Sequence, residues 1–306
     1  MTLEQLRIFV AVATREHVTQ AARDLNLTQS ATSAAVAALE ARYQTKLFDR
    51  VGRRIVLTAA GKTFLIEAKS ILARVAAAEA VLDDLAGLKR GSLALAASQT
   101  IGNYWLPSFI HRFNTTHPAI TLSLTIGNTE QVARQVREGT ADLGFVEGDV
   151  DDPVLAAQPV ADDEMVLVGA PRHVLCDGEP VSAEALKRAR WVLREPGSGT
   201  RAMFEVVLGR LGVRLADLDV ALVLPSNEAV RTAVEAGAGV TVVSRLVVAG
   251  GLKAGTLAMA NIALPGRHFF SLRHREHHLT QAARAFLRMV GEAGTTSAQA
   301  TSLRGA

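Results

Sequence analysis

Residues 17–58 constrain the fold more than any other part of the chain, because their pattern is that of two short helices, a tight turn and a basic hairpin. Small apolar residues recur at helical spacing in both segments, which lets two helices cross closely. Thr19 and Thr28 are placed to cap the two helices, and Asn26 can end the first one in a left-handed conformation. This order predicts a helix-turn-helix, whose second helix inserts its N-terminal end into the major groove of DNA.

Polar side chains near that end of the second helix are short enough to contact base edges, and arginines of the hairpin can reach phosphates. The predicted DNA-binding residues are Thr19, Gln29, Ser30, Thr32, Ser33, Arg50, Arg53 and Arg54. Between Arg42 and Lys62 the chain has six basic residues and one acidic residue. This local excess of positive charge supplies the phosphate-dependent part of DNA binding, although a merely solvated basic face is the alternative.

The order of the short motifs narrows the interpretation. Helical periodicity alone also fits an alanine-rich helix pair of an ordinary helical domain. From Ala21 to Gly61, however, the chain reads A-A-x-x-L, T-Q-S-A-x-S, L-E, L-F-x-R and L-T-x-x-G in that order. This string resembles the LysR-type bacterial transcriptional regulators. It departs from the family pattern at His17 (usually Ser) and Ala59 (usually Pro), and at residues 34–35, where many members carry Arg or Lys.

Residues 59–89 predict one long helix, because they lack proline and carry apolar residues at a/d spacing. Those residues are Phe64, Ala68, Ile71, Val75, Ala78, Leu82 and Leu85. We interpret the segment as a linker helix that pairs with a second copy in a homodimer; a helix covered by the C-terminal part of the chain is the alternative. A two-fold dimer presents two helix-turn-helix units to a pseudo-palindromic site, and dimers can combine into tetramers.

From Gly91 onward strands alternate with helices, which predicts an α/β region with parallel sheets. We expect two doubly wound lobes joined by two crossovers: lobe I, residues 91–162 plus 267–293, and lobe II, residues 163–266. The small polar residues 294–306 predict a disordered tail. The two lobes resemble the periplasmic-binding-protein type 2-like effector domain of the LysR family, so the resemblance extends over nearly the whole chain.

Ligands of open α/β sheets bind beyond the carboxyl ends of strands, at helix N-termini. Residues 98–103, 127–129 and 196–201 form three such junctions. The predicted effector-binding residues are Ser98, Thr100, Asn128, Thr129, Ser198, Thr200 and Arg201. Neutral donors and one arginine suit an oxyanion or a carboxylate, whereas any single junction fits an ordinary helix cap.

The family resemblance adds detail to this site. It places four of these residues in the effector cleft: Ser98, Thr100, Thr129 and Thr200. The strings SQTIGNYWLP and REPGSGTR look most like members that control carbon-fixation or sulfur-assimilation genes. That subgroup implies sulfite, sulfate or a phosphorylated metabolite as the effector.

Other features of the sequence argue against rival classes. The glycine-rich residues 235–240 follow a predicted helix and precede a strand, the reverse of a dinucleotide-binding loop. Histidines at the end of the predicted last strand would point to opposite faces, and Cys176 has an acidic neighbour. We therefore expect no metal site, no cofactor and no enzymatic activity. A solute-binding protein, the other rival, would need export and would have no use for residues 1–89.

No apolar run reaches the ~18 residues that a membrane-spanning helix needs, and the N-terminus has no secretory pattern. We expect a cytoplasmic transcription regulator with a winged helix-turn-helix over residues 1–58, the linker helix, and the α/β effector region. Its expected partners are double-stranded promoter DNA, a small anionic effector and further copies of itself, with RNA polymerase as a further candidate and no membrane. Effector binding is expected to shift the lobe arrangement and so the spacing of the DNA-binding domains.

Overall fold

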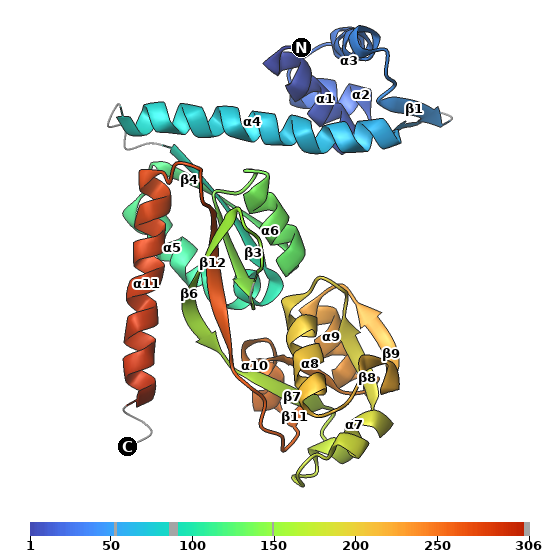
Figure 1. Ribbon diagram of the computed structural model, residues 1–306, viewed down its shortest axis with the longest axis vertical. Coiled ribbons are helices and arrows are strands. Elements are labelled where there is room, and N and C mark those ends of the chain that lie inside the picture. The colour runs from blue at the N-terminus through green and yellow to red at the C-terminus, as the bar shows by residue number, and fades with distance from the viewer. Residues whose placement is uncertain (52–53, 86–90, 149, 303–306) are drawn as a thin grey trace. The chain divides into compact units, whose positions relative to one another are not determined.

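The computed structural model describes residues 1–51, 54–85, 91–148 and 150–302. The chain divides into two compact units, one formed by Met1–Ala86 with Glu138–Thr140 and the other by Gly87–Arg137 with Ala141–Ala306 (Figure 1). None of the described helices is long and apolar enough to span a lipid bilayer.

The N-terminal unit consists of three short helices, a two-stranded hairpin and one long helix (Figure 1). In chain order these are α1 (Leu3–Arg15), α2 (Val18–Asp24), α3 (Gln29–Tyr43), β1 (Phe48–Val51), β2 (Arg54–Leu57) and α4 (Ala59–Leu85). Helices α2 and α3 pack against each other and against α1, which also contacts α4. The predicted winged helix-turn-helix is therefore confirmed, with the antiparallel hairpin β1–β2 as its wing.

Aromatic and small side chains together form the core of this unit. Phe9 of α1 is fully buried, and its ring centroid lies 4.8 Å from that of Phe64 on α4 and 5.5 Å from that of Phe48 on β1. Ala21 and Ala22 of α2 are buried as well. Because these two side chains are single methyl groups, α2 can lie close to the helices beside it.

Two of the three predicted helix ends are confirmed. Asn26 has a left-handed φ of 55° just after α2, and the Thr28 hydroxyl accepts a hydrogen bond of 3.2 Å from a backbone N–H in the first turn of α3. Thr19, however, does not cap α2. His17 is the N-cap residue, and its Nδ1 accepts the corresponding backbone N–H at 3.3 Å. The imidazole nitrogen of His17 caps the helix in place of the expected Thr19 hydroxyl, so α2 begins at Val18.

Glu40 of α3 anchors the start of the wing. Its carboxylate accepts hydrogen bonds from the backbone N–H groups of Leu47 (2.8 Å) and Phe48 (3.1 Å) and from Lys46 Nζ (2.9 Å). Burial alone would raise the pKa of Glu40, but these hydrogen bonds and the charge of Lys46 together lower the pKa. The L-E motif therefore fixes the hairpin to α3.

The L-T-x-x-G motif joins the wing to α4. The Thr58 hydroxyl accepts a hydrogen bond from the Gly61 N–H (2.9 Å) and donates one to the Lys46 carbonyl (2.8 Å). A Cβ at Gly61 would lie 2.1 Å from the Leu47 carbonyl oxygen, so a larger residue would displace the backbone. The start of α4 is thus tied directly to the hairpin.

The apolar residues of α4 lie in two different surroundings. Ala68 is fully buried and Phe64 packs beside it in the core of the N-terminal unit. The first turns of α4 thus pack on α1 of the same unit, a contact that neither sequence interpretation of this helix included. Ile71 and Leu82 are 36 % and 66 % exposed, and their pairing with a second copy stays a prediction. The side chain of Leu85 lies outside the described residues.

Lobe I of the C-terminal unit is built on a five-stranded sheet with the order β4-β3-β5-β12-β6. Its strands are β3 (Gly91–Ser98), β4 (Ile120–Gly127), β5 (Leu143–Glu147), β6 (Leu155–Asp163) and β12 (Arg267–His274). Its helices are a π-helical turn (Ile101–Trp105), α5 (Leu106–Thr116), α6 (Thr129–Arg137) and α11 (Gln281–Ser302). β3 pairs in parallel with β4 and β5, whereas β12 is antiparallel to β5 and β6. The sheet is mixed because β12 returns from lobe II in the opposite direction.

Lobe II contains the three-stranded set β10-β7-β11 and the parallel pair β8-β9. Its strands are β7 (Met165–Gly169), β8 (Arg190–Arg194), β9 (Asp219–Leu224), β10 (Thr241–Ser244) and β11 (Ala258–Met259). Its helices are α7 (Ala183–Arg188), α8 (Gly199–Arg210), α9 (Asn227–Glu235) and α10 (Arg245–Ala254), with 3-10 turns at Val174–Cys176 and Leu215–Asp217. Fully buried Trp191 packs on Phe204 of α8 at the centre of this lobe.

The chain passes between the lobes twice, once between β6 and β7 and again ahead of β12. The predicted lobe borders, after residues 162 and 266, stay a prediction. Residues 235–240 connect α9 to β10, with positive φ angles at Gly237 and Gly239, so they form a helix-to-strand turn. At the C-terminus we expected disorder from residue 294, but α11 continues to Ser302, because no proline interrupts it. Residues 303–306 lie outside the described residues.

We predict that Glu40→Gln loosens the wing. The amide keeps an acceptor oxygen but loses the charge that strengthens the bonds to Leu47 and Phe48, at a cost of about 1 kcal/mol. Protection of these two backbone amides against hydrogen exchange should therefore fall about fivefold at neutral pH. Glu67→Gln, at an exposed site on α4, is the matched control and should change nothing.

The effect should also depend on pH. Because the pKa of folded Glu40 is lowered, its contribution is complete above its ordinary pKa of 4.5 and is lost as the pH falls through the folded value. The difference between wild type and Glu40→Gln should narrow as the pH is lowered toward about 3. A difference that stays constant over this range would contradict the role assigned to the carboxylate.

Candidate functional site

The N-terminal end of α3 presents exposed polar side chains. Gln29 and Ser30 are exposed and Ser33 is half-buried, with Gln29 Nε2 donating to Ser33 Oγ at 3.4 Å. Thr32 differs, because it is fully buried and its hydroxyl donates to the Thr28 carbonyl at 3.1 Å. The prediction that Thr32 contacts DNA is therefore wrong: its position on α3 faces the interior of the unit.

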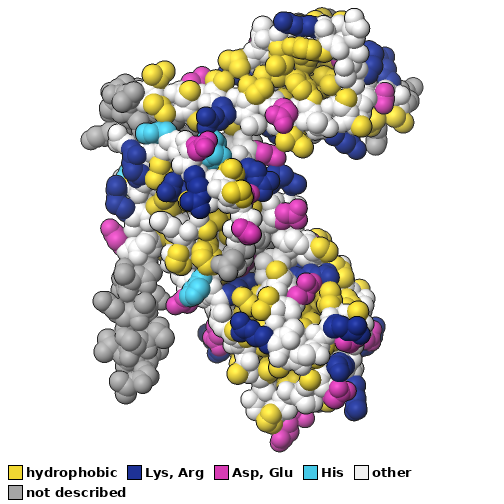
Figure 2. Space-filling view, viewed as in Figure 1, with side chains coloured by type: hydrophobic (Ala, Val, Ile, Leu, Met, Phe, Trp, Pro, Cys, Tyr) yellow, Lys and Arg dark blue, Asp and Glu magenta, His cyan; other side chains and the backbone are white. Residues whose placement is uncertain are grey.

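The other predicted DNA-binding residues lie on α2 and on the wing. Thr19 is exposed on α2 and Arg50 is exposed on β1. Arg53 lies outside the described residues, as does the side chain of Arg54 at the start of β2. Lys and Arg side chains gather on the N-terminal unit near α3 and the hairpin (Figure 2). This surface therefore offers neutral hydrogen-bonding groups beside positive charge.

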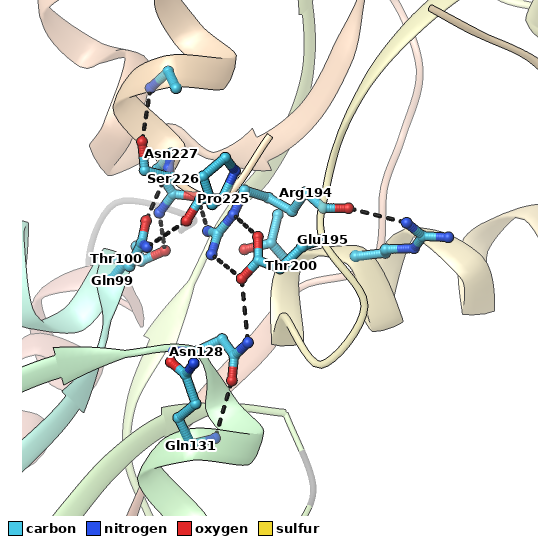
Figure 3. Close-up of polar contacts among 12 residues, drawn as sticks. Gln99, Thr100, Asn128, Gln131, Arg194, Glu195, Thr200, Pro225, Ser226 and Asn227 are labelled. Carbon is cyan, nitrogen blue, oxygen red and sulfur yellow. Dashed lines mark hydrogen bonds and ion pairs between the residues drawn. The ribbon is translucent and has the colours of Figure 1, made fainter. Parts of the chain in front are cut away.

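A chain of hydrogen bonds connects the two lobes of the C-terminal unit (Figure 3). The Thr100 hydroxyl accepts from Asn227 Nδ2 (3.0 Å), and Asn227 Oδ1 accepts from Arg194 Nη1 (2.5 Å). Arg194 also donates twice to the carboxylate of Glu195, at 2.8 and 2.9 Å. That carboxylate accepts a further hydrogen bond from Asn128 Nδ2 at 3.2 Å. The chain starts and ends in lobe I and passes through lobe II.

Further contacts hold the start of α9 against the junction that follows β3. Gln99 Oε1 accepts from the backbone N–H of Asn227 at 2.9 Å. Asn103 Nδ2 and the Tyr104 hydroxyl both donate to Glu228 Oε1, at 3.1 and 3.0 Å. Lobe I therefore contacts lobe II at the N-terminus of α9 and at Glu195, which precedes α8.

The charge of Arg194 is buried between the lobes, and its counter-ion Glu195 is partly exposed. Only 4 % of the Arg194 side chain is exposed, against 24 % of the Glu195 side chain. Burial by itself would raise the pKa of Glu195, but the hydrogen bonds and charge of Arg194, aided by Asn128, lower the pKa overall. Glu195 is therefore an ionised carboxylate at neutral pH.

A second buried cation, Arg267, lies at the start of β12. Its Nε donates to Asp163 Oδ2 at 2.7 Å and its Nη1 donates to the Thr200 hydroxyl at 3.2 Å. Burial raises the pKa of Asp163, although Arg267 and a hydrogen bond from the Ser244 hydroxyl oppose this effect. Glu147 Oε1 is 3.9 Å from Arg267 Nη2, which is beyond hydrogen-bonding distance.

Two polar atoms of this region are buried without a hydrogen-bond partner among the described residues, namely Ser98 Oγ and Arg267 Nη2. Ser98 is 1 % exposed and the Arg267 side chain 0 %. A buried donor without a partner costs about 1–3 kcal/mol. Since both groups can donate a hydrogen bond, a ligand that accepts from them would remove this cost.

A cavity of about 770 Å³ opens between residues of the two lobes. Of the predicted effector-binding residues, Thr129, Ser198 and Arg201 line it, together with Glu147. The remaining predicted residues, Ser98, Thr100, Asn128 and Thr200, are buried and do not line this cavity. The structure thus divides the predicted site between a cavity wall and buried polar groups.

Arg201 does not present a free guanidinium to this cavity. Its Nε donates to Glu205 Oε1 one helical turn further along α8 (2.8 Å), and its Nη1 donates to the Arg194 carbonyl (3.1 Å). Among the described residues, the buried arginines are instead Arg194 and Arg267.

The sequence prediction missed several residues that bond across the lobes, among them Arg194, Glu195, Asn227 and Arg267. The first two belong to the REPGSGTR string, just before its glycines. Asn227 begins α9 soon after β9, a fourth strand-to-helix junction to which the same rule applies. Arg267 begins a strand, where no sequence pattern marks a ligand-binding position.

The histidines near the end of β12 and Cys176 are the residues whose types would suit metal or redox chemistry. Over the described ranges, no three His, Cys, Asp or Glu side chains are arranged to hold a metal ion. The Cys176 Sγ donates to the Ala258 carbonyl at 3.3 Å, and burial raises the pKa of its thiol. A raised pKa disfavours the reactive thiolate.

Comparison with known proteins covers both units. Residues 3–62 match the family described as bacterial regulatory helix-turn-helix protein, lysR family, and residues 86–295 match the LysR substrate binding domain. YeiE of Escherichia coli K12, an uncharacterized HTH-type transcriptional regulator, is 37% identical over 289 residues, covering 94% of this chain and 96% of YeiE.

Two further relatives extend the comparison. A probable RuBisCO transcriptional regulator of Cyanophora paradoxa is 33% identical over 291 residues, which cover 93% of this chain and 90% of that protein. The regulatory domain of CcmR from Synechocystis PCC6803, solved in complex with 2-PG, superposes with a TM-score of 0.61 at 27% identity. That match covers 67% of this chain and 98% of the CcmR chain.

We predict that Asn227→Ala destabilises the C-terminal unit, because it removes partners of Arg194 and Thr100 at once. Loss of a hydrogen bond to a buried charged group should lower the free energy of unfolding by about 2 kcal/mol. Urea unfolding followed by tryptophan fluorescence reports on this unit, since both tryptophans, Trp105 and Trp191, lie in it. Asn114→Ala, at an exposed site on α5, is the control, and an equal effect of both substitutions would contradict the network.

Proposed function

This chain belongs to the LysR family of bacterial transcriptional regulators, and we propose that it senses a small anion between its two lobes and changes its DNA binding in response. Membership, predicted from the motif string, is confirmed over both units. The protein is accordingly a DNA-binding transcriptional regulator with an effector-binding domain. The predicted likeness to regulators of carbon-fixation genes agrees with the relative named as a RuBisCO regulator.

The observation that carries the proposed anion is the pair of buried donors without partners. Ser98 Oγ and Arg267 Nη2 lack hydrogen-bond partners among the described residues, although both are inaccessible to water. A guanidinium nitrogen can only donate, so the ligand has to supply an acceptor there. An oxyanion or a carboxylate has acceptor oxygens in several directions, which suits donors that come from different elements.

The chemistry of the effector is narrowed by charge and by one relative. Arg267 already faces the carboxylates of Asp163 and Glu147, so the site selects by the geometry of its donors more than by net positive charge. The CcmR regulatory domain was solved with 2-PG, a phosphorylated small acid. A phosphorylated metabolite or an inorganic oxyanion is therefore the class of effector that we favour.

The coupling that we propose is a population shift. Arg267 lies at a crossing between the lobes and donates to Thr200 at the start of α8. An anion held by Ser98 and Arg267 of lobe I together with the Thr200 hydroxyl of lobe II favours the lobe arrangement in which these groups converge. Because the two DNA-binding units of a dimer must fit two half-sites, a different lobe arrangement changes which DNA spacing is bound best.

Self-association belongs to the same proposal. Ile66, Ile71 and Leu82 of α4 are exposed apolar side chains, which suits pairing of this helix with a second copy. We propose a homodimer or a tetramer that acts in the cytoplasm on double-stranded promoter DNA, with RNA polymerase as a further partner. No catalytic role is proposed.

Ser98→Ala should separate ligand binding from folding. Because the hydroxyl has no partner among the described residues, its removal should leave the free energy of unfolding within about 0.5 kcal/mol of wild type. The affinity for the anion should fall about tenfold, as measured by calorimetric titration with sulfate and with 2-phosphoglycolate.

The control for this titration is Ser123→Ala, an exposed position on the neighbouring strand β4. It should bind both probes as the wild type does. Wild-type affinity in Ser98→Ala would remove this hydroxyl from the effector site, and the absence of binding by either probe to wild-type protein would argue against the proposed effector class.

DNA binding should divide into two measurable parts. Arg50→Ala should weaken binding to all sequences and reduce the slope of log K against log salt by about 0.9, as expected for one phosphate contact. Gln29→Ala should leave that slope unchanged and lower the preference for the cognate promoter about tenfold. Fluorescence anisotropy on cognate and scrambled fragments measures both, with Arg172→Ala of lobe II as control. Identical effects of the Gln29 and Arg50 substitutions would refute the assignment.

A further inference from the structure

Arg194 and Glu195 form an unusual pair, because they are neighbours in the chain and yet meet side by side. Residue neighbours in a strand point to opposite faces, but β8 ends at Arg194 and the backbone turns there. The turn lets both carboxylate oxygens of Glu195 face the guanidinium, at 2.8 Å from Nε and 2.9 Å from Nη2 (Figure 3). The geometry is that of a bidentate arginine–carboxylate pair.

Donors from both lobes converge on this carboxylate. Arg194 donates from lobe II, and Asn128 Nδ2 donates from lobe I at 3.2 Å (Figure 3). Asn128 follows β4 and is itself held by Gln131, whose backbone N–H donates to Asn128 Oδ1 at 2.9 Å. Three oriented N–H groups around one negatively charged group are what a site for an anionic ligand provides.

We call the donors of Arg194 and Asn128 that surround the Glu195 carboxylate the anion seat. It differs from a surface ion pair because its arginine is buried. The Arg194 side chain is 4 % exposed, and its remaining Nη1 is fixed by Asn227. Glu195 is the more accessible partner, at 24 % exposure, so it can leave while Arg194 stays. Asn227 and the α8 residues that follow Glu195 connect this seat to Thr100 and to the rest of the predicted effector site.

We propose that Glu195 is an internal competitor of the effector: its carboxylate occupies the donors of Arg194 and Asn128 in the ligand-free protein, and an incoming anion must displace it. This inference rests on the proposed function. It makes Glu195 a specificity-determining residue. A ligand binds only if it interacts with these donors more strongly than the singly charged carboxylate that it displaces.

The exchange sets which anions bind. A monocarboxylate returns no more charge and no more acceptor oxygens than Glu195 gives up, so it gains little at this seat. A dianion such as sulfate or a phosphate monoester brings more charge and at least three acceptor oxygens, and can outcompete the side chain. Glu195 therefore excludes monocarboxylates from the effector site in favour of dianionic oxyanions.

The test compares wild type, Glu195→Gln and Glu195→Asp by calorimetric titration with sulfate and with acetate. Glu195→Gln removes the competing charge, and we expect sulfate to bind about tenfold tighter and acetate to become a measurable ligand. Glu195→Asp keeps the charge on a shorter side chain that cannot span both nitrogens as well, and a smaller gain in sulfate affinity is expected. Glu184→Gln, which breaks the ion pair with Lys187 on α7, is the matched control.

The possible results distinguish the role of Glu195 from the proposed anion-sensing function. If sulfate binds to wild type and the Glu195 variants bind it equally or more weakly, Glu195 is a supporting residue and the inference is overturned. If neither anion binds to any of the proteins, the proposed function falls and the inference falls with it. Urea unfolding of each variant checks that a loss of binding does not reflect a loss of folding, and Glu195→Asp decides should Glu195→Gln fail to fold.

Discussion

The arrangement of the two lobes depends on the ion pair between Arg267 and Asp163, which lies where the two connecting segments pass between them. The two side chains are 0 % and 1 % exposed. Removing either partner would leave an uncompensated buried charge, which is among the most destabilising changes that a protein can undergo. Because Arg267 also donates to Thr200 at the start of α8, the buried ion pair connects the two crossing segments to the N-terminus of α8.

The interior between the lobes is rich in charge but has no excess of positive charge. Arg194 is balanced by Glu195, and Arg267 faces both Asp163 and Glu147. Such a site does not attract anions by a long-range electrostatic field. It offers hydrogen-bond donors of Arg194 and Arg267 at fixed positions, beside the carboxylates that balance their charge. In the recognition that we propose, affinity depends on how well the ligand's oxygens replace carboxylate oxygens that are already present.

The motif string predicted the N-terminal unit well, because local chemistry decides its helix ends: Thr28 caps α3 and Asn26 follows α2 as expected. The exception is Thr19, where a histidine nitrogen took a role that is usual for a hydroxyl. Strand-end positions predicted where polar groups gather between the lobes, but pairing depends on three-dimensional neighbours. Arg201 is bound by Glu205 at i,i+4 spacing on α8, a pairing that helical periodicity would have shown, whereas the approach of Arg267 from a distant strand is not visible in the sequence.

The close approach of Gly61 to the Leu47 carbonyl has a mechanical consequence. Together with the hydrogen bonds of Thr58, it holds the first turn of α4 directly against the hairpin. The wing and the start of the long helix must then move as one rigid body. A rotation of α4 at its start would therefore turn the hairpin with it, so the helix would act as a rigid connection to the wing as well as a spacer.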